Sequence, residues 1–238
     1  MRLHTKTILG MGLSVVCMGI GVYVNYWTSS ASKRDDIYAQ EAIQENYIKT
    51  AFPKVKGEFY TSFQSLDEEK APYTLIAFTS LACHVCSTFH RITFQKIQAS
   101  PAYTSGALRV IFVEYPADRI SFFASGYVWA SKSPDQARNR LMDTQESWGE
   151  YNRNLKSAAK IEAEQLKKIQ NILKTTKTLS QKKLTVLFEK KMEAQKVFGI
   201  TDVPFFVLYQ PNKPKGKRIK THVGVMEWDM LYSWLEIR

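Results

Sequence analysis

Two cysteines three positions apart carry the clearest chemical signal in the sequence. Cys83 and Cys86 enclose His84 and Val85, follow the apolar, strand-like run 74–79, and precede a stretch with helical spacing. A cysteine in the first turn of a helix lies beside unpaired backbone N–H groups, and the positive end of the helix dipole stabilises its thiolate. The thiolate attacks disulfides, and the second cysteine lies close enough to resolve the mixed disulfide. The spacing therefore predicts dithiol–disulfide exchange.

The composition makes a scaffold of structural disulfides unnecessary. The chain has 238 residues, and 45% of them are hydrophobic, which is enough for an ordinary core. Of the three cysteines, only Cys17 lies outside the motif, in an apolar N-terminal run. We therefore interpret the pair Cys83 and Cys86 as reactive or metal-binding.

The net charge of +11 is concentrated in two lysine-rich segments, 167–191 and 213–218. Nucleic-acid binding is one interpretation of such a balance. However, no recognised nucleic-acid motif accompanies the charge, and aromatic residues are not interleaved with the lysines as a base-stacking platform requires. We favour a solvated helical face and a basic turn, and we expect no nucleic-acid partner.

The N-terminal residues 1–32 have the pattern of an export signal or a membrane anchor. Basic residues precede the uncharged apolar run 8–24, and small residues such as Ser29 and Ala31 follow it at a spacing that suits cleavage. The run is long for a cleaved signal and near the lower limit for a membrane-spanning helix. In either case the body of the protein is exported to the periplasm or the extracytoplasmic face of the membrane, where disulfides form.

The remaining sequence predicts alternating strands and helices. An amphipathic helix is expected over 33–52, inside a connecting segment 33–54, and it ends at Pro53. Strands are expected at 57–63, 73–79 and 108–115, with one helix between the last two that runs to about residue 99. This strand–helix–strand order predicts a parallel pair with a right-handed crossover.

The second half is expected to be helical before it returns to strands. Residues 119–198 contain apolar positions at helical intervals, with breaks near 131–134 and 175–180. Two strands, 205–209 and 218–224, are separated by a short basic turn, which predicts an antiparallel hairpin. A terminal amphipathic helix is expected over 226–237.

This order of elements resembles the thioredoxin fold, and the helical insertion at about 119–198 resembles that of the DsbA family. The segment 198–207, Phe-Gly-Ile-Thr-Asp-Val-Pro-Phe-Phe-Val, is similar to the Gly-x-x-x-x-Pro-x-Phe-Val segment of that family. The resemblance covers about residues 55–238. It implies an α/β thioredoxin fold with the insertion between the βαβ unit and the C-terminal hairpin, in a single DsbA-like domain.

The resemblance also implies a role for each residue of the site. Cys83 is expected to be the exposed nucleophile and Cys86 the buried resolving thiol. Pro204 is expected to be cis and to face the pair, so that the backbone of Val203 binds the substrate chain as an added strand. His84 between the cysteines is expected to favour the thiolate and, with the neighbouring Val85, to tune the potential of the pair. No cofactor is required.

The sequence departs from the family pattern at two positions. The intervening pair is His-Val, where the family usually has Pro-His. The residue six positions before the first cysteine, which is often acidic in the family, is Ala77. Glu114 on the next strand is a candidate for a buried carboxylate, but the sequence leaves open which face of the sheet it occupies.

These features predict an exported oxidoreductase that donates disulfides to translocated, unfolded proteins with cysteines. A membrane quinone-linked enzyme of the DsbB or vitamin K epoxide reductase type is the expected reoxidising partner. Val203, where isomerases carry threonine, resembles the oxidising members of the family. The alternative within redox chemistry is a disulfide reductant or isomerase.

Two further classes are weighed against redox chemistry. Cys83, Cys86 and His90 have a spacing that could bind zinc or copper, with His222 as a remote fourth ligand, but we expect His90 to be a partly buried surface residue. The lysine-rich insertion could instead serve as a docking face of an adaptor. We expect the aromatic residues of the insertion to belong to the core, and these are Trp129, Trp148 and Tyr151.

Overall fold

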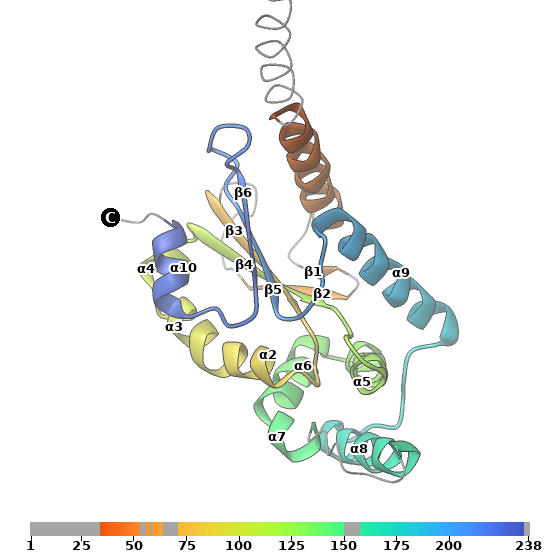
Figure 1. The fold of residues 1–238 in the computed structure, drawn as a ribbon. Helices are drawn as coiled ribbons and strands as arrows, with labels where there is room; N and C mark the ends of the chain where they lie inside the picture. The colour runs from red at the N-terminus through yellow and green to blue at the C-terminus, as the bar shows by residue number, and fades with distance from the viewer. Residues whose placement is uncertain (1–33, 53–55, 58, 64–70, 150–157, 236–238) are drawn as a thin grey trace, which may run out of the picture. The chain divides into compact units, whose positions relative to one another are not determined.

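The chain divides into two compact units, Met1–Ile43 and Gln44–Arg238. The structure is a computed structural model that describes residues 34–52, 56–57, 59–63, 71–149 and 158–235 (Figure 1). Residues 34–51 are helical, close to the predicted helix, and the division falls within them. The predicted signal or anchor, residues 1–32, lies outside the described residues. Within the described part, no helix is long and apolar enough to cross a membrane.

A six-stranded mixed sheet in the order β1-β2-β4-β3-β5-β6 forms the centre of the second unit (Figure 1). Its strands are β1 Lys56–Gly57, β2 Tyr60–Phe63, β3 Tyr73–Thr79, β4 Leu108–Glu114, β5 Phe205–Tyr209 and β6 Ile219–Val223. β3 and β4 are parallel, and the other neighbouring strands are antiparallel. The predicted parallel pair and the C-terminal hairpin are therefore confirmed. The single strand predicted over 57–63 is wrong, because the chain turns at Phe59, where φ is 68°, and forms the antiparallel pair of β1 and β2.

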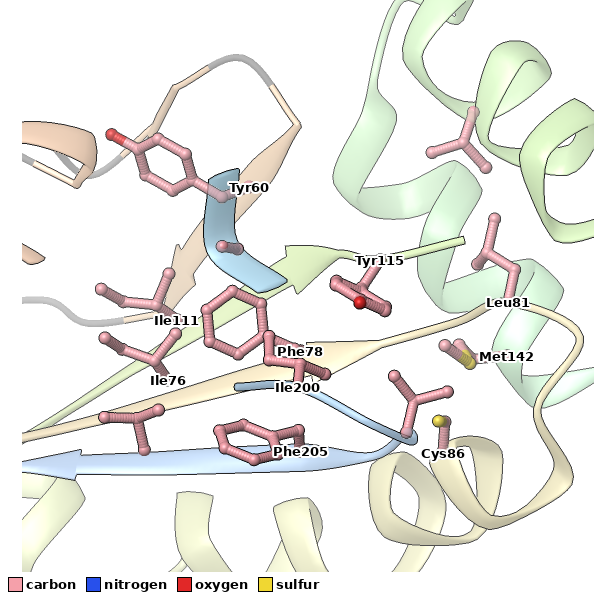
Figure 2. Packing of buried hydrophobic residues seen from close by; sticks show 14 of the residues in the cluster. Tyr60, Ile76, Phe78, Leu81, Cys86, Ile111, Tyr115, Met142, Ile200 and Phe205 are labelled. Atoms are coloured by element: carbon pink, nitrogen blue, oxygen red, sulfur yellow. The ribbon is translucent and has the colours of Figure 1, made fainter. Parts of the chain in front are cut away.

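The central strands β3 and β4 are apolar because both faces of the sheet are covered. On one face, Leu75 and Val110 pack with the helices α3 (Phe94–Gln98) and α10 (Trp228–Leu235). On the other face, Ile76 and Ile111 belong to the larger apolar cluster that includes Cys86 (Figure 2). The sequence periodicity alone could not separate these two faces, since nearly every position in both strands is buried.

The helical segment after the cysteines is interrupted by a π-helical turn. It consists of α2 His84–Thr88, η2 Phe89–Thr93 and α3 Phe94–Gln98, where a single helix was predicted. The wider turn adds one residue to the helical repeat, and such bulges are frequent at functional sites. The predicted stop is confirmed: Ser100 caps the short helix α4 Pro101–Thr104, which begins at the proline.

The insertion is helical as predicted. Its helices are α5 Arg119–Ala130, α6 Pro134–Asp143, α7 Gln145–Trp148, α8 Ala158–Leu173 and α9 Gln181–Phe198. Gly199, with φ of 68°, ends α9 in the left-handed conformation that glycine adopts without strain. Trp148 is fully buried and Trp129 is partly buried against the core, as expected, whereas Tyr151 lies outside the described residues.

The bounds of three elements differ by one or two residues from those predicted. β4 ends at Glu114, β6 covers Ile219–Val223, and α10 covers Trp228–Leu235. Differences of one or two residues at the ends of an element are ordinary. α3, α4 and α10 lie together on one side of the sheet (Figure 1).

Candidate active site

Cys83 is the N-cap residue of α2, at the end of the loop that leaves β3. Its backbone is extended, and its Sγ accepts a hydrogen bond from the N–H of Cys86 at 3.2 Å. Cys83 is half-buried, and Cys86 is fully buried. Figure 2 shows Cys86 pointing from α2 into the apolar cluster, toward Met142. One sulfur is thus open to an incoming chain, and the other is enclosed.

The segment before β5 faces Cys83. The Val203–Pro204 peptide bond is cis, as the resemblance implied. The Cys83 thiol donates to the carbonyl oxygen of Val203 at 3.5 Å, and the N–H of Val203 donates to Oδ1 of Asp202 at 2.8 Å. The Val203 carbonyl, one of the two backbone groups expected to bind a substrate strand, therefore lies at Cys83. An incoming chain must replace the bonds that Cys83 and Asp202 make with them.

The pKa values of the two thiols are shifted in opposite directions. A hydrogen bond from the Cys86 thiol, together with the amides of Cys86 and Val85, lowers the pKa of Cys83, although partial burial and the charge of Asp202 oppose this. Burial raises the pKa of Cys86 well above its ordinary value, and the hydrogen bond to Cys83 adds to the effect. Cys83 is therefore the thiol that loses its proton more readily.

The loop before Cys83 is held by the start of α5. The Ser80 hydroxyl donates to Oγ of Ser121, which in turn donates to Oδ1 of Asp118 at 2.8 Å. The same Ser121 oxygen accepts the N–H of Ala82 at 3.4 Å. From α7, the side chain of Gln145 donates to the carbonyl of Ala82 at 3.0 Å. We call Ser80, Ser121 and Asp118 the loop clamp.

The loop clamp also reaches the buried sulfur. The backbone N–H of Ser80 forms a hydrogen bond that lowers the pKa of Cys86, against the larger effect of burial. Both serines are fully buried. The clamp therefore fixes the direction of an amide that stabilises negative charge on Cys86.

The histidines occupy different environments. His84 is exposed at the first position of α2, so its expected tuning role stays a prediction. The expectation that His90 lies partly buried at the surface is wrong: its side chain is buried in η2, and the ring stacks on Phe94. Burial, and secondarily the charges of Arg138 and Arg91, lower the pKa of His90 to about 3.

The metal-binding alternative gains no support from this geometry. In the described part of the chain, no group of three or more His, Cys, Asp or Glu side chains is arranged to hold a metal ion. His222, the proposed remote ligand, lies on β6, and its Nε2 is 2.7 Å from the carbonyl oxygen of Val225.

Glu114, the candidate buried carboxylate of the sequence analysis, is buried at the end of β4. Its register partner on β3 is Thr79. Its carboxylate interacts with the side chains of Ser125 and Trp129, which favour the ionised form. Burial raises the pKa of Glu114 to about 7, although the nearby charge of Arg138 opposes the rise.

Arg138 is the residue of this region that the sequence analysis missed. It lies on α6 and is 2% exposed. Its Nη2 donates to Oγ1 of Thr79 at 2.9 Å, and its guanidinium carbon lies 4.2 Å from the centre of the Phe112 ring. A signal was present: α6 buries positions 137, 138, 141 and 142, and an arginine within such an apolar stripe is unusual.

The comparisons with known proteins agree with this architecture. The family model described as Thioredoxin matches residues 65–222, which is more than half of the chain. No curated protein matches the sequence.

Several solved structures share the fold. α-DsbA1 of Wolbachia pipientis is 21% identical with a TM-score of 0.54, and the match covers 75% of this chain and 89% of that protein. A protein-disulfide isomerase from Novosphingobium aromaticivorans is 12% identical with a TM-score of 0.56, covering 76% and 97%. The catalytic domain of Proteus mirabilis ScsC is 17% identical with a TM-score of 0.53, covering 82% and 96%. The chain therefore belongs to the thioredoxin family, and its fold is DsbA-like.

Proposed function

We propose that the protein is an exported oxidoreductase that donates the disulfide between Cys83 and Cys86 to translocated proteins. The observation that carries the proposal is the opposite acidity of the two thiols. A lowered pKa of the nucleophilic thiol stabilises the reduced pair, and a pair that is stable when reduced is a good oxidant.

The exchange proceeds in two balanced steps. A substrate thiolate attacks Sγ of Cys83, so that a substrate–Cys83 disulfide forms, the bond between Cys83 and Cys86 breaks, and Cys86 leaves as a thiolate that then takes up a proton. A second substrate thiolate attacks the substrate sulfur of this mixed disulfide, and Cys83 leaves as its stabilised thiolate. The substrate loses two electrons, and the cysteine pair gains them.

Binding of the substrate is assigned to the segment that faces the pair. The backbone of Val203 and the adjoining Pro204 would align an extended chain beside Cys83, which is how main-chain hydrogen bonds supply affinity without side-chain specificity. Unfolded cysteine-containing proteins have such extended chains. The short distance from the Val203 oxygen to Sγ of Cys83 supports this assignment.

Export and reoxidation complete the proposal. The basic start and apolar run of residues 1–32 support export, with residues 8–24 as the signal core or the anchor. A reduced pair must return its two electrons, and we assign this to a membrane quinone-linked partner of the DsbB or vitamin K epoxide reductase type. The disulfide chemistry in the name of the protein-disulfide isomerase is compatible with the same cycle.

One observation favours the alternative, a reductant or isomerase. The charge of Asp202 raises the pKa of Cys83 and so lowers the oxidising power of the pair. One of the similar structures is a protein-disulfide isomerase. We rank this function second because the net shift of the Cys83 pKa is downward.

The test is a direct transfer of the disulfide. The oxidised full-length protein is mixed with a reduced, unfolded protein that contains two cysteines, and free thiols are counted over time. We expect the substrate to become oxidised while the protein becomes reduced, and we expect Cys83→Ser to transfer nothing. A protein that leaves this substrate reduced but reduces insulin disulfides would support the alternative.

A further inference from the structure

Arg138 is a buried cation that the exchange steps do not yet use. We propose that Arg138 is a positioning residue through which the helical insertion holds a fixed positive charge against Cys86, so that this sulfur leaves and attacks as a thiolate. The inference rests on the proposed function and deepens it by assigning a residue to the leaving-group side of the reaction.

The guanidinium is fixed in place by contacts on two sides. Oγ1 of Thr79, at the end of β3, accepts a hydrogen bond from Nη2, and the Phe112 ring lies beneath the guanidinium carbon. Nε and Nη1 have no hydrogen-bond partner among the described residues. A buried cation with unused donors is costly unless an anion compensates it. The side chain therefore has two donor groups available to a nearby negative charge.

The helix that carries Arg138 packs directly on the helix that carries Cys86. The hydroxyl of Ser87, the residue after Cys86, donates to the carbonyl of Met142 at 2.8 Å, one turn along α6 from Arg138. Met142 and Cys86 belong to the same apolar cluster (Figure 2). This contact holds α6 against α2, the helix that carries the buried sulfur. The two groups interact electrostatically, since the charge of Arg138 lowers the pKa of Cys86.

Glu114 interacts with the same guanidinium and can compete with Cys86 for it. Its carboxylate is buried and interacts with Arg138. Above a pH of about 7 Glu114 is ionised, and it shares the guanidinium with any thiolate that forms on Cys86. Removing Arg138 and removing Glu114 must therefore change the stability of that thiolate in opposite directions.

Three other titratable groups face Arg138. Asp135 and Asp143, on its own helix, also interact with the guanidinium, and His90 in η2 faces its charge. Asp135 accepts a hydrogen bond from Thr61 on β2 at 2.7 Å, and Asp143 is largely exposed. His90 stays neutral above pH 5, because its pKa is about 3. At pH 8, Glu114 is thus the buried group whose charge the test has to separate from that of Cys86.

The step on which Arg138 acts is the opening of the protein disulfide. A thiolate attacks Sγ of Cys83, the bond to Cys86 breaks, and the electron pair of that bond stays on Cys86. A thiol with a lower pKa leaves faster. The charge of Arg138 should accelerate this step, and, in the reverse direction, it should raise the thiolate fraction of Cys86 that attacks a mixed disulfide.

The experiment measures how fast reduced glutathione opens the disulfide of the oxidised full-length protein between pH 6 and pH 9. At pH 8 we expect Arg138→Met to react about tenfold more slowly than wild type. We expect Arg138→Lys, which keeps the charge, to restore most of the rate. Glu114→Gln should react faster than wild type at pH 8, and the two rates should converge at pH 6, where Glu114 is already protonated.

The matched control is Arg140→Met, which removes an exposed arginine of the same helix whose Nη1 donates to the carbonyl of Ile172. We expect the control to react like wild type. The inference is overturned if a folded Arg138→Met variant stays within twofold of wild type, or if Arg138→Lys is as slow as Arg138→Met. If Arg138→Met does not fold, Glu114→Gln decides: an unchanged or slower rate at pH 8 overturns the inference.

The same assay separates this inference from the proposed function. If the wild-type protein forms no disulfide between Cys83 and Cys86, the proposed function fails, and the inference fails with it. If the wild type forms the disulfide and reacts with glutathione while Arg138→Met reacts equally fast, only the inference fails.

Discussion

At the scale of single residues, the position on one short helix makes two identical thiols chemically different. Cys83 at the N-cap meets backbone amides, whereas Cys86, one turn later, meets apolar side chains. Helix N-termini stabilise anions, and apolar surroundings penalise them. The sequence spacing predicted a stabilised thiolate at the start of the helix, and the family resemblance implied that Cys83 is exposed and Cys86 buried.

Asp202 should restrain the reactivity of Cys83. Its charge raises the pKa of the Cys83 thiol, and Asp202→Asn keeps an oxygen that can accept the Val203 N–H. We expect the substitution to lower the pKa of Cys83 and to speed its alkylation by iodoacetamide at pH 6 about twofold. Alkylation rates measured against pH report this shift. The exposed Asp229→Asn on α10 serves as the control, and equal rates for both variants would contradict the prediction.

Glu114 should make the folded protein less stable as the pH rises. Its pKa is 4.5 in an ordinary environment and about 7 here. Between these values the unfolded chain loses the proton while the folded chain keeps it, so the free energy of unfolding falls with rising pH. Relative to wild type, Glu114→Gln should therefore gain about 2–3 kcal/mol between pH 5 and pH 8. Urea unfolding at both pH values measures the gain.

The comparison of Glu114→Gln with wild type isolates this carboxyl from the other titrating groups. Ionised Glu114 interacts with Arg138 only at the higher pH, and this interaction is already included in its pKa of about 7. His90 acts in the opposite direction, since its low pKa lowers stability as the pH falls, but it is present in both proteins. If the difference between the two proteins does not change with pH, Glu114 is not the buried acid described here.

At the scale of elements, the insertion holds the loop from which α2 begins. α5 starts at Arg119 with Asp118 as its cap, and the cap side chain binds Ser121, which binds Ser80 and the N–H of Ala82. The N-terminus of α5 thereby holds the loop residues that precede Cys83. The insertion is part of the active site and not an appendage to it.

Loss of the loop clamp should destabilise the protein measurably. Ser121→Ala leaves the buried hydroxyl of Ser80 and the amide of Ala82 without the oxygen they share, which should cost about 1–3 kcal/mol. The free energy of unfolding in urea measures this cost. The exposed Ser147→Ala on α7 should cost much less. If Ser121→Ala is as stable as wild type, the loop clamp does not contribute to the free energy of unfolding.

The elements that the sequence predicted well are those whose signals are local. The apolar runs of β3 and β4, the stop at Ser100 and the breaks around the insertion follow from composition and from proline and serine positions. The π-helical turn η2 could not be predicted, because it depends on how the helix packs and not on its spacing. This turn also explains why the environment of His90 was predicted wrongly.

At the scale of the whole molecule, the active site joins two parts that are distant in the sequence. The core supplies Cys83, Cys86 and the cis Val203–Pro204 bond, and the insertion supplies Arg138 and Gln145. The cysteine pair and Pro204 could be predicted because each has a motif. Arg138 and the loop clamp could not, because their contacts cross from one element to another and leave only a weak local pattern.

The most direct test of the central claim is the redox equilibrium of Cys83 and Cys86 against glutathione, with Cys83→Ser as the control. A disulfide donor should have a reduction potential near or above about −150 mV, where strongly oxidising pairs lie. We predict a value in that range for wild type and no intramolecular disulfide for the control. A value near about −250 mV would contradict the account and assign the protein to the reductants.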